Sequence, residues 1–199
     1  MQGFQVPIKN REIISLVFRK QRQLPTSDNE LLVRVAEGDK QAFMTLYERY
    51  RERLFTYCCR MLGDRERAKD ALQDAFLKAY QNAGMYQSGT NVAAWLFRLT
   101  RNVCIDILRT RKEHDPIDDL QLAIGEPAAD VMLQEALTDE IEKLPEIYRE
   151  AVVLRDVQGH SYEEIAAITG TALSTVKFRI FKARDTLRQR LATYLVDEQ

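Results

Sequence analysis

Residues 174–184 place polar, cationic and aromatic side chains where they could read nucleic acid. At about 100° per residue, the apolar face of this segment is opposed or flanked by Ser174, Thr175, Lys177, Phe178, Arg179, Phe181, Lys182 and Arg184. Serine, threonine and lysine can reach base edges in the major groove, phenylalanine can contact thymine methyls, and arginine and lysine can hold phosphates. The segment is therefore a candidate DNA-reading helix. Packing of both phenylalanines on another part of the chain is the alternative, and the two arrangements can alternate.

The residues before this segment have the spacing of a helix-turn-helix. An S-x-x-E capping box predicts a helix over 162–169, followed by a turn and a final helix over 172–195. Counting from Tyr162, Ala166 is fifth, Gly170 ninth and Val176 fifteenth, which gives a small residue at the crossing, a turn residue tolerant of positive φ and an apolar anchor. An ordinary helical hairpin is the alternative.

A second basic helix is expected over residues 92–112, after a polar loop over 84–91. The candidate binding residues of this part are Tyr86, Ser88, Asn91, Trp95, Arg98, Arg101 and Asn102. Cations for the backbone and an aromatic side chain beside a flexible polar loop suit the capture of unstacked bases from a single strand. A charge-rich helix is also commonly a solvated face, so that interpretation stays open.

The remaining sequence predicts helices in almost every segment. Apolar residues recur at three and four positions, and Ser27, Asp64 and Asn91 are suitable N-caps. No segment shows sustained strand alternation. The further helices are expected over 28–38, 39–62, 64–84, 130–144 and 145–159. The predicted fold class is all-α, with a helical bundle followed by a helix-turn-helix domain.

Charge along the chain predicts two domains. The whole chain has a formal charge of -1, but residues 113–150 hold 12 acidic and 2 basic residues. The start of this stretch contains two prolines and a glycine and has weak periodicity, which is typical of a linker. The predicted parts are a basic, disordered extension over 1–27, a domain over 28–112, a flexible acidic linker over 113–129 and a domain over 130–199. A partner-binding helix or a misassigned start are alternatives for the extension.

Several function classes lack their sequence signals. No HExxH, P-loop or GxSxG motif is present, so an enzyme is not expected. Three cysteines without CxxC spacing and two histidines give no metal site, and no cofactor is expected. Apolar runs are too short for a membrane span, and the expected location is the cytoplasm. The cysteines are interpreted as packing residues, with a redox role for Cys58 and Cys59 as the alternative.

Several of these segments together resemble a known family. Residues 68–80 and 94–102, with Asp106 and Arg109, resemble region 2 of bacterial sigma factors of the extracytoplasmic-function (ECF) type. Leu144-Pro145, residues 161–166 and residues 174–184 resemble region 4 of the same family. The resemblance covers about residues 28–195, in the family's order.

This resemblance implies a dissociable initiation subunit of core RNA polymerase without catalytic activity. It implies that Asp70, Gln73, Asp74 and Phe76 dock on the clamp helices of the β′ subunit. The loop over 84–91 and the helix from Trp95 would capture the melted −10 element of promoter DNA. The second domain would sit on the β flap while its last helix reads the −35 element, and an anti-sigma factor would control the protein. Val92 and Phe178 depart from residues that the family often has. A stand-alone regulator that binds operator DNA as a dimer is the alternative.

Overall fold

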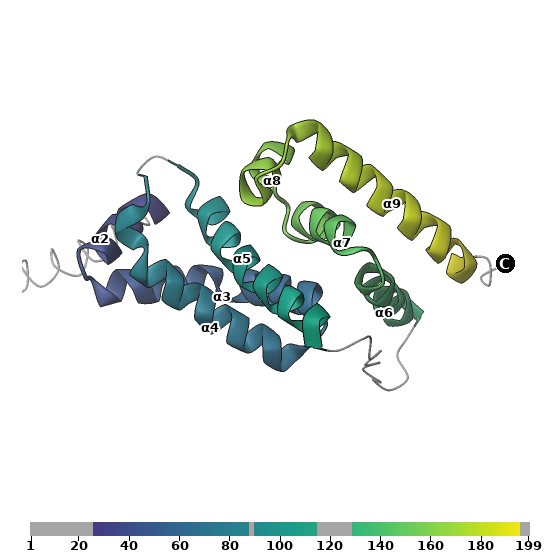
Figure 1. Cartoon of the computed structure of the whole chain (residues 1–199), viewed down its shortest axis with the longest axis horizontal. Helices are drawn as coiled ribbons and strands as arrows, with labels where there is room; N and C mark the ends of the chain where they lie inside the picture. The colour runs from purple at the N-terminus through teal and green to yellow at the C-terminus, as the bar shows by residue number, and fades with distance from the viewer. Residues whose placement is uncertain (1–25, 88–89, 115–128, 196–199) are drawn as a thin grey trace, which may run out of the picture.

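The described part of the chain is helical throughout. The computed structural model describes the backbone of residues 26–87, 90–114 and 129–195, and the side chains of these except 111–114, 129–135 and 193–195. No strand occurs within these ranges (Figure 1). The elements are α2 (Asp28–Ala36), α3 (Lys40–Leu62), α4 (Arg65–Gln81), the 3₁₀ turn η1 (Ala83–Met85), α5 (Val92–His114), α6 (Ala129–Glu142), α7 (Glu146–Val152), the π-helical η2 (Val153–Val157), α8 (Tyr162–Thr169) and α9 (Leu173–Leu195). The all-α prediction is confirmed.

Short polar residues begin the helices of the first half. Ser27 forms a capping box with Glu30, and the carboxylates of Asp39 and Asp64 accept bonds from the first amides of α3 and α4. Gly63 ends α3 with φ of 66°, in the left-handed region that a residue with a side chain avoids. These local signals are why the helix boundaries lie close to the predicted ones.

α3 is the central helix of the first half. It packs against α2, α4 and α5, and its Tyr57 ring meets the Phe97 ring of α5 edge-on, with centroids 5.7 Å apart. Both rings are fully buried. Burial of side chains of this size stabilises a fold by several kcal/mol, so the α3–α5 contact fixes the position of the basic helix.

The predicted helix over 145–159 is present as far as Val157, but its second half is a π-helix and not an α-helix. Pro145 precedes α7, which runs only from Glu146 to Val152, and the chain continues as the π-helical η2. The amide of Gln158 donates to the carbonyl of Val153 at 3.0 Å, five residues back. Such π segments are rare and their wider turn shifts the side chains that follow. Periodicity of apolar residues does not signal them.

The two halves of the chain pack against each other. α5 of the first half lies beside α8 of the second (Figure 1), and α3 contacts α6 and α7. One cluster of buried apolar residues includes members of both halves. Most of the predicted extension over 1–27 and most of the predicted linker over 113–129 lie outside the described residues. No helix among the described residues is long and apolar enough to cross a membrane.

Candidate nucleic-acid interface

The turn before α9 is built by Gly170. Its φ is 68°, and its amide closes α8 by donating to the carbonyl of Ala166 at 2.9 Å. After the turn, α9 places Val176, Ile180 and Ala183 in the core, all at most 2% exposed. The predicted apolar face of the reading helix is confirmed. Because this face is anchored, the opposite face must point outward.

The outward face of α9 presents two aromatic rings to solvent. Phe178 and Phe181 are 53% and 60% exposed, and Ser174, Lys177 and Lys182 beside them are exposed as well. The predicted alternative, in which these rings pack on another part of the chain, is not seen among the described residues. Thr175 is half-buried. An apolar pair of this kind, rimmed by cations, is typical of a binding surface.

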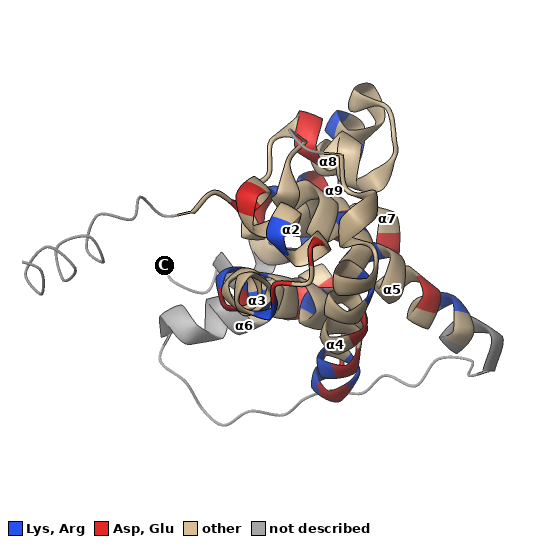
Figure 2. Ribbon diagram, turned by 90° about the vertical axis from the view of Figure 1, so that its left-hand side faces the viewer, with Lys and Arg blue, Asp and Glu red and all other residues tan. Residues whose placement is uncertain are grey.

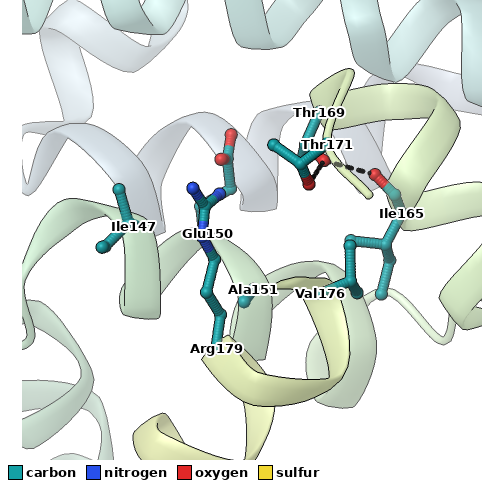
Figure 3. Close-up of a pocket in the computed structure, with 8 residues that line it drawn as sticks. All are labelled: Ile147, Glu150, Ala151, Ile165, Thr169, Thr171, Val176 and Arg179. Atoms are coloured by element: carbon teal, nitrogen blue, oxygen red, sulfur yellow. Dashed lines mark hydrogen bonds between the residues drawn. The ribbon is translucent and has the colours of Figure 1, made fainter. Parts of the chain in front are cut away.

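Of two arginines at the edge of α9, one is paired within the protein and the other is half-buried. Arg184 Nε donates to Asp156 Oδ2 at 3.0 Å, and this hydrogen bond raises the pKa of the arginine further. Arg179 is half-buried and, with Glu150 of α7, lines a shallow hollow without room for a ligand (Figure 3). The hollow is a packing gap. The exposed reading surface therefore centres on Ser174, Lys177, Phe178, Phe181 and Lys182.

The polar loop before α5 is partly ordered by aromatic contacts. The Tyr86 ring meets the Trp95 ring edge-on at 5.5 Å, and its hydroxyl lies 2.6 Å from Asn29 Oδ1 of α2. The turn η1 occupies the first part of the predicted loop, and Ser88 lies outside the described residues. Trp95 is half-buried. The indole is thus held in place by its neighbours, with one part of it accessible.

The predicted binding residues of α5 divide into two groups. Arg98 and Asn102 are exposed and available to a ligand. Asn91 accepts a bond from the amide of Ala94, as predicted for a cap, but its Nδ2 also donates to Glu164 of α8 at 2.6 Å. Arg101 Nε donates to Glu150 at 2.6 Å and the side chain is only 22% exposed. Carboxylates of the second half hold both side chains in this conformation, so the contact of Asn91 and Arg101 with DNA stays a prediction that requires these bonds to break.

The predicted polymerase-binding residues comprise three exposed polar residues and one buried phenylalanine. Asp70, Gln73 and Asp74 are exposed on α4, where acidic and basic side chains are mixed (Figure 2). Phe76 is 4% exposed and packs edge-on against Phe43 and, at 4.7 Å, against Tyr47. Contact of Phe76 with polymerase stays a prediction, and in this structure the ring is covered by α3. Its role is to hold α4 on α3.

Sequence reasoning missed two apolar residues on the exposed side of α4. Leu77 is 53% and Tyr80 39% exposed, and the Tyr80 ring packs on Phe43 with centroids 5.2 Å apart. They follow Asp70, Gln73 and Asp74 at intervals of three and four. A helical wheel of α4 would have found them, because this interval keeps residues on one face.

The cysteines lie in the core of the first half. Cys58 and Cys104 are completely buried, with their sulfurs 3.7 Å apart, and Cys59 is half-buried. The hydrogen bond to Cys58, together with burial, raises the pKa of Cys104, and burial raises that of Cys59. Protonated thiols are poor nucleophiles and poor metal ligands. No cluster of three or more potential metal ligands occurs in the described part of the chain.

Known proteins share both halves of this architecture. The family models for sigma-70 region 2 and sigma-70 region 4 match residues 46–114 and 134–187. The ECF RNA polymerase sigma factor SigM of Mycobacterium tuberculosis is 37% identical, over 85% of this chain and 86% of its own length. The RNA polymerase sigma-H factor of Pseudomonas aeruginosa is 33% identical, over 84% and 95%.

A solved structure agrees with these matches. The sigma factor RpoE of Bartonella quintana, in its complex with the anti-sigma factor NepR, is similar with a TM-score of 0.67 and 27% identity, over 75% of this chain and 96% of the matched one. The two-part helical fold and the exposed reading helix define a DNA-binding protein of transcription initiation. The chain belongs to the ECF RNA polymerase sigma factors of the sigma-70 family, whose members are transcription regulators rather than enzymes.

Proposed function

We propose that this chain directs core RNA polymerase to a specific set of promoters by reading the −35 element with α9. The observation that carries the proposal is the pair Phe178 and Phe181, more than half exposed beside Lys177 and Lys182 on a helix set by the Gly170 turn. In the major groove, these rings can cover thymine methyls while the lysines reach base edges.

In this proposal the first half of the chain binds the −10 element of the promoter. Arg98 and Asn102 are exposed on α5, and the held indole of Trp95 offers a face for an unstacked base. The −10 surface comprises Tyr86, Ser88, Asn91, Trp95, Arg98, Arg101 and Asn102. Two of these residues, Asn91 and Arg101, become available only when their bonds to the second half are broken.

Polymerase is the third component of the proposal. The exposed side of α4, with Asp70, Gln73 and Asp74, docks on the β′ clamp helices, and the second half docks on the β flap. Tyr80 and Leu77 extend this face with apolar area. The relative from Bartonella quintana occurs in complex with an anti-sigma factor, which supports control of this chain by such a partner.

Reconstituted transcription tests the proposal. The full chain is mixed with core polymerase and a genomic promoter library, and transcript start sites are sequenced. Initiation at promoters that share two spaced elements is expected. A double substitution Phe178→Ala/Phe181→Ala should abolish the preference at the upstream element while leaving the helix content unchanged. Tight dimeric DNA binding without any specific transcript would instead support an operator-binding regulator.

A further inference from the structure

The two halves meet along α5 at three successive points. Asn91 Nδ2 donates to Glu164 of α8 at 2.6 Å, the Phe97 ring packs edge-on against the His160 ring at 4.5 Å, and Arg101 Nε donates to Glu150 of α7 at 2.6 Å. At 1.5 Å per residue, these contacts cover roughly 15 Å of the helix. We call this row of contacts the seam.

Glu150 is the buried centre of the seam. The Glu150 side chain is 3% exposed. Arg101 Nη2 donates to Glu150 Oε2 at 3.3 Å, so the two hydrogen bonds make the ion pair bidentate. The hydroxyl of Tyr57 donates to the same carboxylate at 3.2 Å. An acid of the second half is therefore enclosed by groups of α3 and α5 in the first half.

Among protein side chains, a carboxylate that binds arginine in a bidentate way resembles a phosphate group most closely. Guanidinium binds both anions through two parallel hydrogen bonds. Glu150 and Glu164 hold two side chains that the proposed function assigns to the −10 element, Arg101 and Asn91. The second half thus occupies part of the nucleic-acid surface of the first half.

We expect the seam to open without unfolding either half, because most helix contacts lie within one half. Desolvation of a buried ion pair costs about as much as the pair returns, and separated halves rehydrate both charges. Elsewhere between the halves, the bond from Arg53 Nη2 to the carbonyl of Gln158 at 2.9 Å is exposed to water and contributes little. Arg149 Nη1 of α7 donates to the carbonyl of Met61 at 3.0 Å from a half-buried position. Removal of one charge leaves the other buried without compensation. Opening relieves this charge at the cost of exposing apolar residues that the halves bury together.

We propose that Glu150 and Glu164 act as an intramolecular substitute for nucleic-acid phosphate, which keeps the halves closed and withholds Arg101 and Asn91 until the seam opens. The identity of the nucleic acid rests on the proposed function, whereas closure by the Glu150–Arg101 pair does not.

Closure is tested on the full chain by solution scattering and amide hydrogen exchange. Arg101→Met leaves Glu150 uncompensated and should increase the radius of gyration and speed exchange in α7 and α8 by about tenfold or more. The amides of α2–α4 should keep their protection, which separates opening from unfolding. Glu163→Gln changes an exposed acid of α8 and is the matched control, with no expected effect.

Exchanging the two charges tests whether the Glu150–Arg101 ion pair is what closes the seam. Glu150→Arg alone should open the seam, and the double variant Glu150→Arg/Arg101→Glu should restore the wild-type radius and protection. If Arg101→Met leaves both measurements unchanged, or if the exchanged pair fails to restore them while both halves keep their helix content, closure by this pair is overturned.

Masking is tested with a short single-stranded DNA oligonucleotide. Glu150→Gln frees Arg101 and should raise affinity about tenfold in fluorescence anisotropy, whereas Glu163→Gln should not. If Glu150→Gln opens the seam without a gain in affinity, masking is overturned and closure stands. Failure of the proposed function would show differently, as absence of promoter-specific transcripts from variants whose seam still opens.

Discussion

Gly170 determines the angle at which the reading helix leaves the turn. An added Cβ would meet nothing within 4 Å, but the φ of 68° strains any residue that carries one. Gly170→Ala should therefore cost about 1–2 kcal/mol of unfolding free energy, measured by urea denaturation. Gly84→Ala is the matched control, because Gly84 has equal space and no positive φ; its effect should stay within about 0.5 kcal/mol. Equal losses would contradict the argument.

Lys182 tests whether α9 reads bases. It is exposed next to Phe181. Lys182→Ala should relax one position of the upstream element and cost roughly 1–3 kcal/mol at that base if the lysine contacts guanine. Selection from a randomised promoter library measures this, with the exposed Lys40→Ala as control. Uniform weakening across all sequences would make Lys182 a phosphate contact.

At the scale of elements, α4 has a face that packs on α3 and an exposed face that we propose to bind polymerase. Phe76→Ala should destabilise the chain by about 3–5 kcal/mol, since the ring is buried against Phe43 and Tyr47. Asp74→Ala should leave stability within about 0.5 kcal/mol but weaken binding to core polymerase. Thermal melting and a polymerase affinity measurement separate the two. If Phe76→Ala keeps its stability but loses polymerase binding, Phe76 belongs to the surface that contacts polymerase.

The segment from η2 to α8 makes the seam sensitive to pH. His160 is 3% exposed between the halves, and burial lowers its pKa from the ordinary 6.5. Glu164 of α8 opposes this shift, and Arg53 of α3 adds to it. Arg155 donates to the carbonyl of His160 at 2.8 Å. The closed state therefore favours the neutral ring, while the open or unfolded state takes up a proton first.

Stability of the seam should consequently be full above about pH 6.5 and fall as the pH drops toward 5. Amide exchange of α7 and α8 as a function of pH measures this. His160→Gln should flatten the curve over that interval. At lower pH α8 itself should lose stability, because its N-terminal capping bond from the amide of Ser161 holds the pKa of Glu164 below its ordinary 4.5. An unchanged curve in His160→Gln would exclude the histidine as its cause.

At the scale of the whole molecule, the affinity for promoter DNA depends on the charge of the segment between the halves and on the tethering of both halves to polymerase. Residues 113–129 contain no lysine or arginine, so the segment between the halves adds no phosphate contact. With two small surfaces, one of them partly covered by the seam, the free chain should bind a promoter duplex no tighter than about 1 µM at physiological salt. Core polymerase should increase the apparent affinity by tethering both halves near their elements. Nanomolar promoter binding by the free chain would contradict this.

Local sequence alone was sufficient for most of the fold and for the reading helix. Capping residues and apolar periodicity act within one helix, so the boundaries of α8 and the buried face with Val176 and Ile180 were predictable. The same reasoning placed Phe178 and Phe181 outward. The π-helical turn at Val153–Val157 was not predictable, because it depends on which carbonyl pairs with Gln158.

Tertiary structure decided which polar residues remain available. Arg101 and Glu150 are 49 residues apart in the chain, and Asn91 and Glu164 are 73 apart, so no local pattern could pair them. Phe76 lies on the inner side of α4 only because Phe43 and Tyr47 of α3 pack there. By itself the sequence determined the helices and the types of residue that could bind DNA. The packing of one half on the other decided which of those residues are free, since burial and ion pairing depend on neighbours that the chain brings together only when it folds.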